Sequence, residues 1–277
     1  MQASELRLAA RQALCCAEPA VKCQQVAQLA ALGSALAVDP HANLTAHTDP
    51  IPGRPHRPVL IAPGQVPPRS PFTAEGHAAL IHAICHIEFN AINLALDAIW
   101  RFDGMPEAYY RDWLQVASEE AYHFGLLRTH LNGLASPQRP HGWDYGDFDA
   151  HDGLWAMCEK TAHDRVARMA LVPRTLEARG LDATPLIQHK LRKVGSAQAI
   201  EAIGLLDIIV RDEVGHVAIG NRWYRWLCEA QGLDPVAHYR QLARAYSAPR
   251  LKPPFNEAAR REAGFSDEEM AFLQQAL

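Results

Sequence analysis

The sequence predicts an all-α protein. Almost no segment of the 277-residue chain alternates apolar and polar residues with the two-residue period of a strand. Long stretches instead repeat apolar residues at helical spacing, with capping residues, prolines and glycines where such stretches begin and end. Apolar residues make up 48% of the chain and charged residues 21%, which is ordinary for a globular protein with a sizeable core.

The first 72 residues divide into two parts. Residues 3–37 are rich in Ala, Leu and Gln, and we expect one or two helices there. Residues 39–72 contain DPIPGRPHRPVLIAPGQVPPRSP, which has too many prolines for a helix or a central strand and is too apolar for a free linker. We therefore interpret residues 1–72 as N-terminal helices followed by an extended, proline-rich belt that lies across the protein.

The rest of the chain is predicted to form a four-helix bundle over 73–232 and a helical tail over 233–277. The bundle helices and their breaks follow from capping and breaking residues, among them Thr73, Pro106, Gly180 and Ser196. Helices are expected over 73–102, 106–131, 152–179, 184–194 and 196–231. The stretch 132–151 has no helical pattern, and the tail is expected to hold a helix near 234–246 and a short one after Ser266.

Two short segments share one pattern. Residues 119–124 read EEAYHF and residues 211–216 read RDEVGH, so in both an acidic residue precedes a glutamate that stands three residues before a histidine. Glu120 and His123 therefore share a helix face, as do Glu213 and His216. One such pair is common by chance, whereas two pairs on two long helices indicate a metal site.

A further glutamate, Glu88, stands on the helix before the first pair. Gly104 of the FDGMP turn is midway between positions 88 and 120, so in an antiparallel hairpin both lie about 24 Å from the turn and face each other. Apolar residues surround Glu88 at helical spacing, and a buried carboxylate costs several kcal/mol unless it is neutralised, paired or bound to a metal. A buried salt bridge, for example with Arg128, is the alternative interpretation.

Glu177, in MALVPRTLEARGLD, is the corresponding candidate for the second pair, and Glu159 is the alternative donor in the same predicted helix. We expect this helix to break directly beyond Glu177, at Gly180. Pro173, four residues before Glu177, also weakens the helical hydrogen bonds. A break beside a site often admits substrate.

Four glutamates and two histidines suit a pair of divalent ions. Four carboxylates balance four positive charges, two of them can bridge, and open positions remain for oxygen or water. One glutamate from each of two helices and a Glu-x-x-His pair from each of two others is the arrangement of ferritin-like di-iron and di-manganese bundles. The candidate ligands are Glu88, Glu120, His123, Glu177, Glu213 and His216. Iron is the expected metal, and manganese is compatible with the same ligands.

Several segments resemble a bacterial family of ferritin-like, di-metal carboxylate proteins of unassigned function. They are AICHIEFNAINLALDAIWRFDGMP, EEAYHFGLL, YGDFDAHDGLW, RMALVPRTLEARGLD and RDEVGHVAIGNRW, and the likeness covers roughly residues 50–275. The resemblance implies a ferritin-like fold with two metal ions and favours Glu177 over Glu159, but it implies no substrate. In helix order and ligand pattern alone, the chain is distantly similar to the di-iron hydroxylase that modifies isopentenyl-adenosine in tRNA.

The acidic residue that precedes each ligand glutamate has an expected role as well. A metal-bound imidazole commonly donates its second N–H to a carboxylate. We hypothesise that Glu119 orients His216 and that Asp212 orients His123. Tyr122, inside the first motif, could be a redox-active tyrosine, with simple packing as the alternative interpretation.

The preferred functional prediction is an O₂-dependent oxidase or monooxygenase with an unknown organic substrate. The substrate would be a small molecule or a modified nucleoside in a pocket lined by Ile84, Cys85, Ala91 and the break after Glu177. An electron-donor protein and a second copy of the chain are candidate partners. Iron storage or detoxification is one alternative, which the belt and tail disfavour because storage requires a compact bundle that assembles into a shell. A non-catalytic ferritin-like binding module is the other.

Composition argues against several other classes. The net charge is −4 and the pI about 6.4, and no basic stripe marks a nucleic-acid or acidic-membrane surface. The N-terminal residues lack the apolar run of a signal peptide, and no stretch reads as a transmembrane span. We therefore expect a cytoplasmic protein whose six cysteines are reduced.

Overall fold

The computed structural model describes residues 5–275 except 43, 45–48 and 138. Throughout this part of the chain the regular elements are helices, and β pairing is limited to isolated bridges. The prediction of an all-α protein is therefore confirmed. By its internal contacts the chain divides into two compact units, Met1–Trp155 and Ala156–Leu277.

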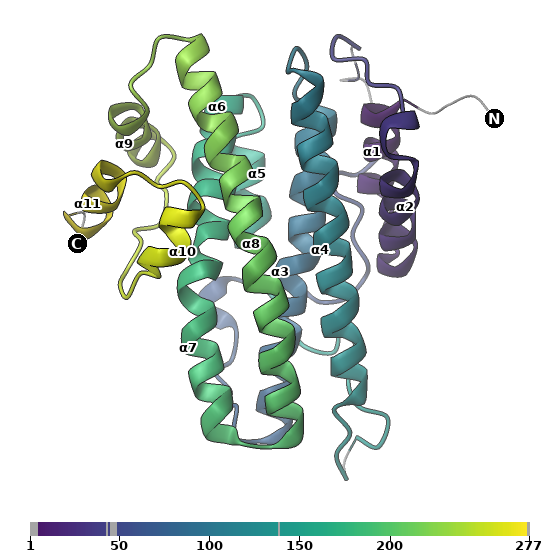
Figure 1. The fold of residues 1–277 in the computed structure, drawn as a ribbon. Coiled ribbons are helices and arrows are strands. Elements are labelled where there is room, and N and C mark those ends of the chain that lie inside the picture. Colours follow the sequence, from purple (N-terminus) through teal and green to yellow (C-terminus); the bar gives the residue numbers. More distant parts are fainter. Residues whose placement is uncertain (1–4, 43, 45–48, 138, 276–277) are drawn as a thin grey trace. The chain divides into compact units, whose positions relative to one another are not determined.

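The core of the first unit is a hairpin of two long helices, α3 (Ala74–Arg101) and α4 (Glu107–Gly133), which run side by side in Figure 1. Thr73 begins α3 as predicted, because its hydroxyl accepts a hydrogen bond from the Gly76 N–H at 3.0 Å. Pro106 stands one position earlier than expected, as the residue that precedes the first turn of α4. Both helices end within two residues of their predicted ends.

The turn between α3 and α4 is fixed by contacts on both sides. Gly104 has φ of +66°, which favours glycine, and its N–H donates to the Pro40 carbonyl at 2.7 Å. The Tyr110 hydroxyl donates to the Phe102 carbonyl at 2.9 Å and lies 3.2 Å from the Met105 nitrogen. These contacts hold the hairpin in one register, which decides what residues on α3 and α4 face each other.

The described part of 3–37 forms two α-helices, α1 (Leu6–Cys15) and α2 (Pro19–Leu32), and the short 3₁₀ helix η1 (Gly33–Ala35), where the sequence left one or two helices open. Helix α1 packs on α3 and α2 packs on α4. One fully buried lysine, Lys22 of α2, joins several segments: its ammonium donates to the carbonyls of Leu14 at 3.1 Å and Gly53 at 3.3 Å, and to the side chain of Asn93. Three acceptors compensate for the removal of this amine from water.

The proline-rich belt lies extended against the first unit. The Ile61 N–H donates to the Ala150 carbonyl at 2.9 Å, and the Ala150 N–H donates to the Val59 carbonyl at 3.0 Å. Arg54 forms an ion pair with Asp152, with a shortest separation of 2.5 Å. The belt is therefore paired with the end of the connection that follows α4.

The second unit contains a helix pair and a tail. Its first helical run is α5 (Gly153–Lys160), which begins in the first unit, α6 (Arg165–Leu171), the π-helical segment η3 (Val172–Glu177) and α7 (Ala178–Val194); α7 lies beside α8 (Ala197–Ala230) in Figure 1. Ser196 caps α8 as predicted, and Gly195 ends α7 with φ of +69°.

The predicted helix 152–179 and its break at Gly180 are wrong. The chain turns at 161–164, widens into η3 before Glu177, and then continues as α7 through Gly180 and Pro185. A proline inside a helix leaves the carbonyl four residues earlier without its N–H donor. Here that carbonyl belongs to Leu181, and the side-chain amide of Asn256 donates to it at 3.3 Å.

The tail consists of α9 (Pro235–Ala245), α10 (Glu257–Glu262) and α11 (Asp267–Gln275), and it packs on the α7–α8 pair. A buried apolar cluster joins the tail to the pair: Ala178, Leu181, Val217, Ala263, Phe265, Met270 and Leu273. The buried Arg260 also forms an ion pair with Asp182 of α7 at 2.6 Å. The tail is thus an integral part of the core of the second unit.

Helix α3 is long and apolar enough to cross a membrane by length and composition, but 78% of its most apolar window is buried inside the protein. Core helices of globular proteins pass the same test, so this feature is weak evidence for a span. Each unit contributes one pair of long helices. Their assembly into one ferritin-like bundle over 73–232 stays a prediction.

Candidate metal centre

The α3–α4 hairpin brings together three buried candidate ligands. Nδ1 of His123 lies 3.3 Å from Oε2 of Glu88 and 3.6 Å from Oε2 of Glu120. All three side chains are buried, and each offers a ligand atom within 4.8 Å of the other two. This proximity follows from the hairpin register, in which Glu88 lies level with Glu120 about the turn at Gly104. The three residues form the first half-site.

The protonation of this half-site shows how its charges interact. Burial, followed by the neighbouring carboxylate of Glu120, raises the pKa of Glu88. Burial alone would lower the pKa of His123, but the two glutamates outweigh it and raise that pKa. Two carboxylates and an imidazole removed from water must therefore share protons. A divalent cation would replace those protons as the balancing charge.

The residues present fit a metal ion. Oε2 of Glu88 is buried, and no donor among the described residues meets hydrogen-bond geometry with it. The alternative salt bridge to Arg128 is not formed, because that guanidinium makes two hydrogen bonds with Asp144, at 2.7 and 2.8 Å. The set of two carboxylates and one imidazole suits iron, manganese or zinc.

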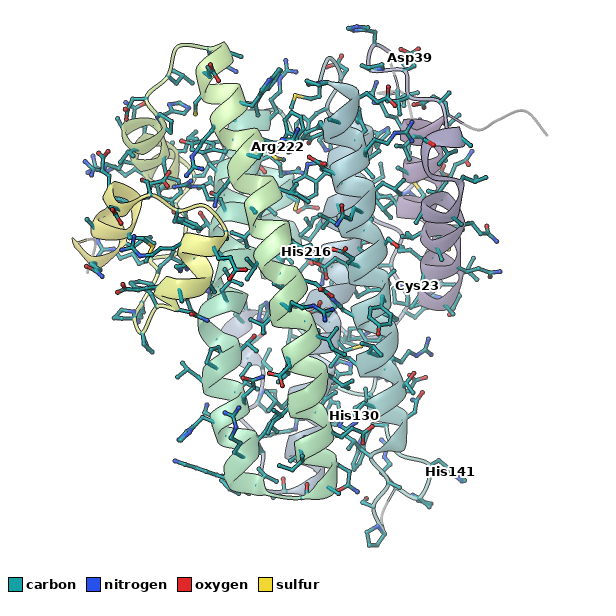
Figure 2. The ribbon with its side chains drawn as sticks, viewed as in Figure 1. Cys23, Asp39, His130, His141, His216 and Arg222 are labelled. Atoms are coloured by element: carbon teal, nitrogen blue, oxygen red, sulfur yellow. The ribbon has the colours of Figure 1, made fainter. Side chains whose placement is uncertain are left out.

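Helix α8 of the second unit carries the other motif. Nδ1 of His216 lies 3.6 Å from Oε1 of Glu213, and both side chains are buried. In Figure 2, His216 is labelled near the middle of α8. Oε2 of Glu213 is also buried and accepts no hydrogen bond within the described part of the chain. These two residues resemble Glu120 and His123 in spacing and geometry.

Glu177 is the last residue of η3, which packs against α8, and its side chain is buried. The alternative donor, Glu159, is exposed and stands on the eight-residue helix α5. Burial therefore favours Glu177 over Glu159. Glu177, Glu213 and His216 are the candidate ligands of the second unit.

Comparison with known proteins places the chain in a protein family. A family model described as "Protein of unknown function (DUF455)" matches residues 15–271. The chain belongs to the DUF455 family. It is 49% identical to a protein of Haemophilus influenzae described as "Uncharacterized protein" over 232 residues, which cover 81% of this chain and 77% of that one. No solved structure matches the chain.

The expected membership of a bacterial family of unassigned function is therefore confirmed. Neither comparison carries the ferritin-like resemblance or the distant similarity to the tRNA hydroxylase. In this DUF455 protein, the buried glutamates and histidines are the feature that points to a metal.

The residues expected around the ligands have varied surroundings. Glu119 is half-buried and accepts a hydrogen bond from the Gln115 amide at 3.0 Å, and Asp212 is half-buried beside the Arg211 guanidinium at 2.9 Å. Their predicted pairing with His216 and His123 joins residues of different units and stays a prediction. Tyr122 is 54% exposed, which fits neither simple packing nor a shielded redox-active tyrosine.

Sequence reasoning missed a polar network on the other side of α3. Nδ1 of His86 lies 2.9 Å from the Tyr145 hydroxyl and its Nε2 lies 3.0 Å from the Asn90 amide. This network lines a small cavity together with Phe89, belt residues and Arg54. The cavity thus lies at positions other than Ile84, Cys85 and Ala91, where a substrate pocket was expected. The sequence signal for this network is the polar residues His86 and Asn90, which stand two positions before and after Glu88 on α3.

Proposed function

We propose that this DUF455 protein holds two metal ions in a carboxylate-rich centre and uses them as an O₂-dependent oxidase or monooxygenase. The observation that supports the proposal best is the buried group of Glu88, Glu120 and His123, whose carboxylates need a cation or shared protons. The matching pair on α8 and the buried Glu177 supply a second set of the same composition.

In this proposal the six candidate ligands hold the two ions. Glu88, Glu120 and His123 come from the first unit, and Glu177, Glu213 and His216 from the second. The four carboxylates would balance the four positive charges of two divalent ions, and the two imidazoles would complete a ligand set that suits iron or manganese. The ferritin-like four-helix bundle is part of this proposal.

Bound iron would supply the redox chemistry that O₂ activation requires. The protein's own residues bind and orient. Glu119 and Asp212 accept the second N–H of the ligand histidines and so fix the imidazole planes. The apolar residues that surround Glu88 on α3 exclude water from the site and so prevent side reactions with solvent.

The substrate class in this proposal is a small organic molecule or a modified nucleoside, and the electrons come from a donor protein in the cytoplasm. Iron storage or detoxification remains the competing function. The two functions differ in the number of ions that one chain takes up, so metal stoichiometry separates them.

The test is anaerobic loading of the purified protein with Fe²⁺, followed by elemental analysis and measurement of O₂ uptake. We expect two irons per chain, consumption of O₂ and no mineral core. Glu120→Gln should lose at least one iron, because an amide cannot replace the carboxylate charge. Glu159→Gln, at the exposed alternative position, should retain both ions.

The possible results of this test distinguish the proposed function from its alternatives. Many irons per chain with a mineral core would establish storage instead. Failure to bind Fe²⁺ or Mn²⁺ at all, or a Glu120→Gln protein that binds as the native one does, would exclude a metal function at these residues. A loss of metal in Glu159→Gln would transfer the ligand role from Glu177 to Glu159.

A further inference from the structure

The segment that precedes Glu177 is wider than an α-helix. In η3 the backbone follows a π-helical pattern, with hydrogen bonds to the fifth rather than the fourth preceding residue. One additional residue in a helix turns everything after it by about 100° and advances it by about 1.5 Å. Whether η3 keeps its π form therefore decides the face of the helix on which Glu177 stands.

The side chain of Arg174 links η3 to the tail. It is 3% exposed, and its guanidinium forms an ion pair with Oε1 of Glu269 on α11 at 2.7 Å. It also donates to Oδ1 of Asn221 on α8 at 2.8 Å. The rings of Tyr224, Tyr239 and Phe265 surround the guanidinium at 4.8–5.2 Å from their centroids.

The Glu269 carboxylate is held in its ionised form by several neighbouring groups. Burial alone would raise the pKa of Glu269, but Arg174 and Arg225 outweigh it and hold the pKa below its usual range. The Ser266 N–H donates to the same carboxylate at 2.7 Å, and Arg225 lies 2.9 Å from it. The carboxylate thus stays ionised and oriented at neutral pH.

Two further contacts act on the same segment. The Thr175 hydroxyl donates a hydrogen bond to the Ala170 carbonyl at 2.8 Å, within the widened turn. It also lies 3.0 Å from the Tyr239 hydroxyl of α9. Pro173 sits against Gly220 of α8, where an added Cβ would lie 2.5 Å from the proline Cβ. Residues of η3 are therefore fastened to α8 on one side and to the tail on the other.

We propose that Arg174 and Glu269 are a positioning pair, through which the C-terminal tail holds η3 in its π form and sets the orientation of Glu177 as a metal ligand. This inference rests on the proposed function, because it assigns the pair a role at the same centre. The tail then controls how tightly the ion bound by Glu177 is held. The pair acts through the backbone and touches neither ion.

The test uses the full chain and Co²⁺, which reports its ligands through visible absorption. Glu269→Gln keeps the shape of the side chain and removes its charge. We expect it to weaken the binding of one of two Co²⁺ ions by about 10- to 100-fold, the usual cost of losing a residue that orients a ligand. The visible spectrum of the remaining bound metal should change as well.

Two variants serve as controls, and a third can replace Glu269→Gln. Glu268→Gln alters the exposed neighbour on the same helix and should leave Co²⁺ binding unchanged. Asp182→Asn loosens the tail at its ion pair with Arg260, so it should lower the melting temperature without changing the Co²⁺ spectrum. If Glu269→Gln fails to fold, Tyr239→Phe removes only the hydroxyl near Thr175 and should weaken the same ion by a smaller factor.

A second readout is independent of metal. In the metal-free protein, the backbone amides of residues 173–178 should exchange with deuterium faster in Glu269→Gln than in Asp182→Asn. A native protein that takes up no cobalt would overturn the proposed function together with this inference. A native protein that takes up two ions, with Glu269→Gln unchanged in affinity and spectrum, would overturn the positioning role alone.

Discussion

Several polar side chains of this protein are buried in the core, and His82 is one of them. Its imidazole is 1% exposed, and its Nε2 accepts a hydrogen bond from the Gly146 N–H at 2.9 Å. The rings of Tyr145 and Phe148 lie 5.5 and 5.4 Å from it. Because Nε2 is an acceptor, protonation of His82 would break this bond as well as place a charge among aromatic rings.

This residue predicts a loss of stability in mild acid. Burial lowers the pKa of His82 to about 4, whereas the unfolded chain has a value near 6.5. Between these values the unfolded state binds more protons, so the free energy of unfolding falls as pH falls from 6.5 to 4, by about 3 kcal/mol at most. Urea unfolding measured at several pH values should show this decline.

Two variants isolate the contribution of His82. In His82→Gln the amide oxygen reaches the position of Nε2 and can still accept from Gly146 but cannot titrate, so the decline should be shallower. His141→Gln, at an exposed histidine of the same connection, should decline as the native protein does. An equally steep decline in His82→Gln would show that other groups cause the acid sensitivity.

At the scale of elements, η3 depends on a close approach between two helices. Gly220→Ala should destabilise the second unit by about 1–3 kcal/mol, because the new methyl group overlaps Pro173. Gly204→Ala on the same helix α8 has open space and should stabilise by about 0.5–1 kcal/mol. Melting temperatures of the two variants measure the difference, and equal shifts would mean that η3 yields without cost.

Some features of the helices could be predicted because they depend on nearby residues alone. Thr73 and Ser196 were recognised as caps because capping depends on the residue and its next few neighbours. The closeness of Glu88 and His123 follows from counting residues from Gly104, since a tight turn fixes the register of an antiparallel hairpin. These parts of the fold and of the first half-site could be predicted from the sequence.

Other parts could not, because distant residues decide them. Pro185 was expected to begin a new helix, yet Asn256 satisfies the Leu181 carbonyl and α7 continues. Similarly, Pro173 suggested a weak point in the helix, but the next residue, Arg174, pairs with a tail residue nearly a hundred positions later. No local pattern marks such partners.

At the scale of the whole molecule, the candidate ligands of the proposed centre are divided between the two units. A ligand that binds only the folded state stabilises it, by about 2.7 kcal/mol at a concentration of 100 times its dissociation constant. Co²⁺ should therefore raise the unfolding temperature of both units together. Differential scanning calorimetry with and without Co²⁺ measures this shift.

Variants in either unit test the coupling. Glu120→Gln in the first unit and Glu213→Gln in the second should each reduce the Co²⁺-induced shift for the whole molecule. Glu229→Gln, exposed near the end of α8, should keep the full shift. Two independent sites would give a different result, in which each variant affects the transition of its own unit and leaves the other untouched.

Helix α3 has one more consequence, which concerns the synthesis of the protein. It leaves the ribosome before α4, when only the helices that precede it can cover part of its apolar surface, and its length and hydropathy match those of segments that insertion machinery accepts. A charged side chain at the centre of an inserted helix costs about 2.5–3.5 kcal/mol, and α3 carries Glu88 at its centre and Asp97 closer to its end. The acidic residues that later lie in the core thus first oppose diversion of the nascent chain into a bilayer.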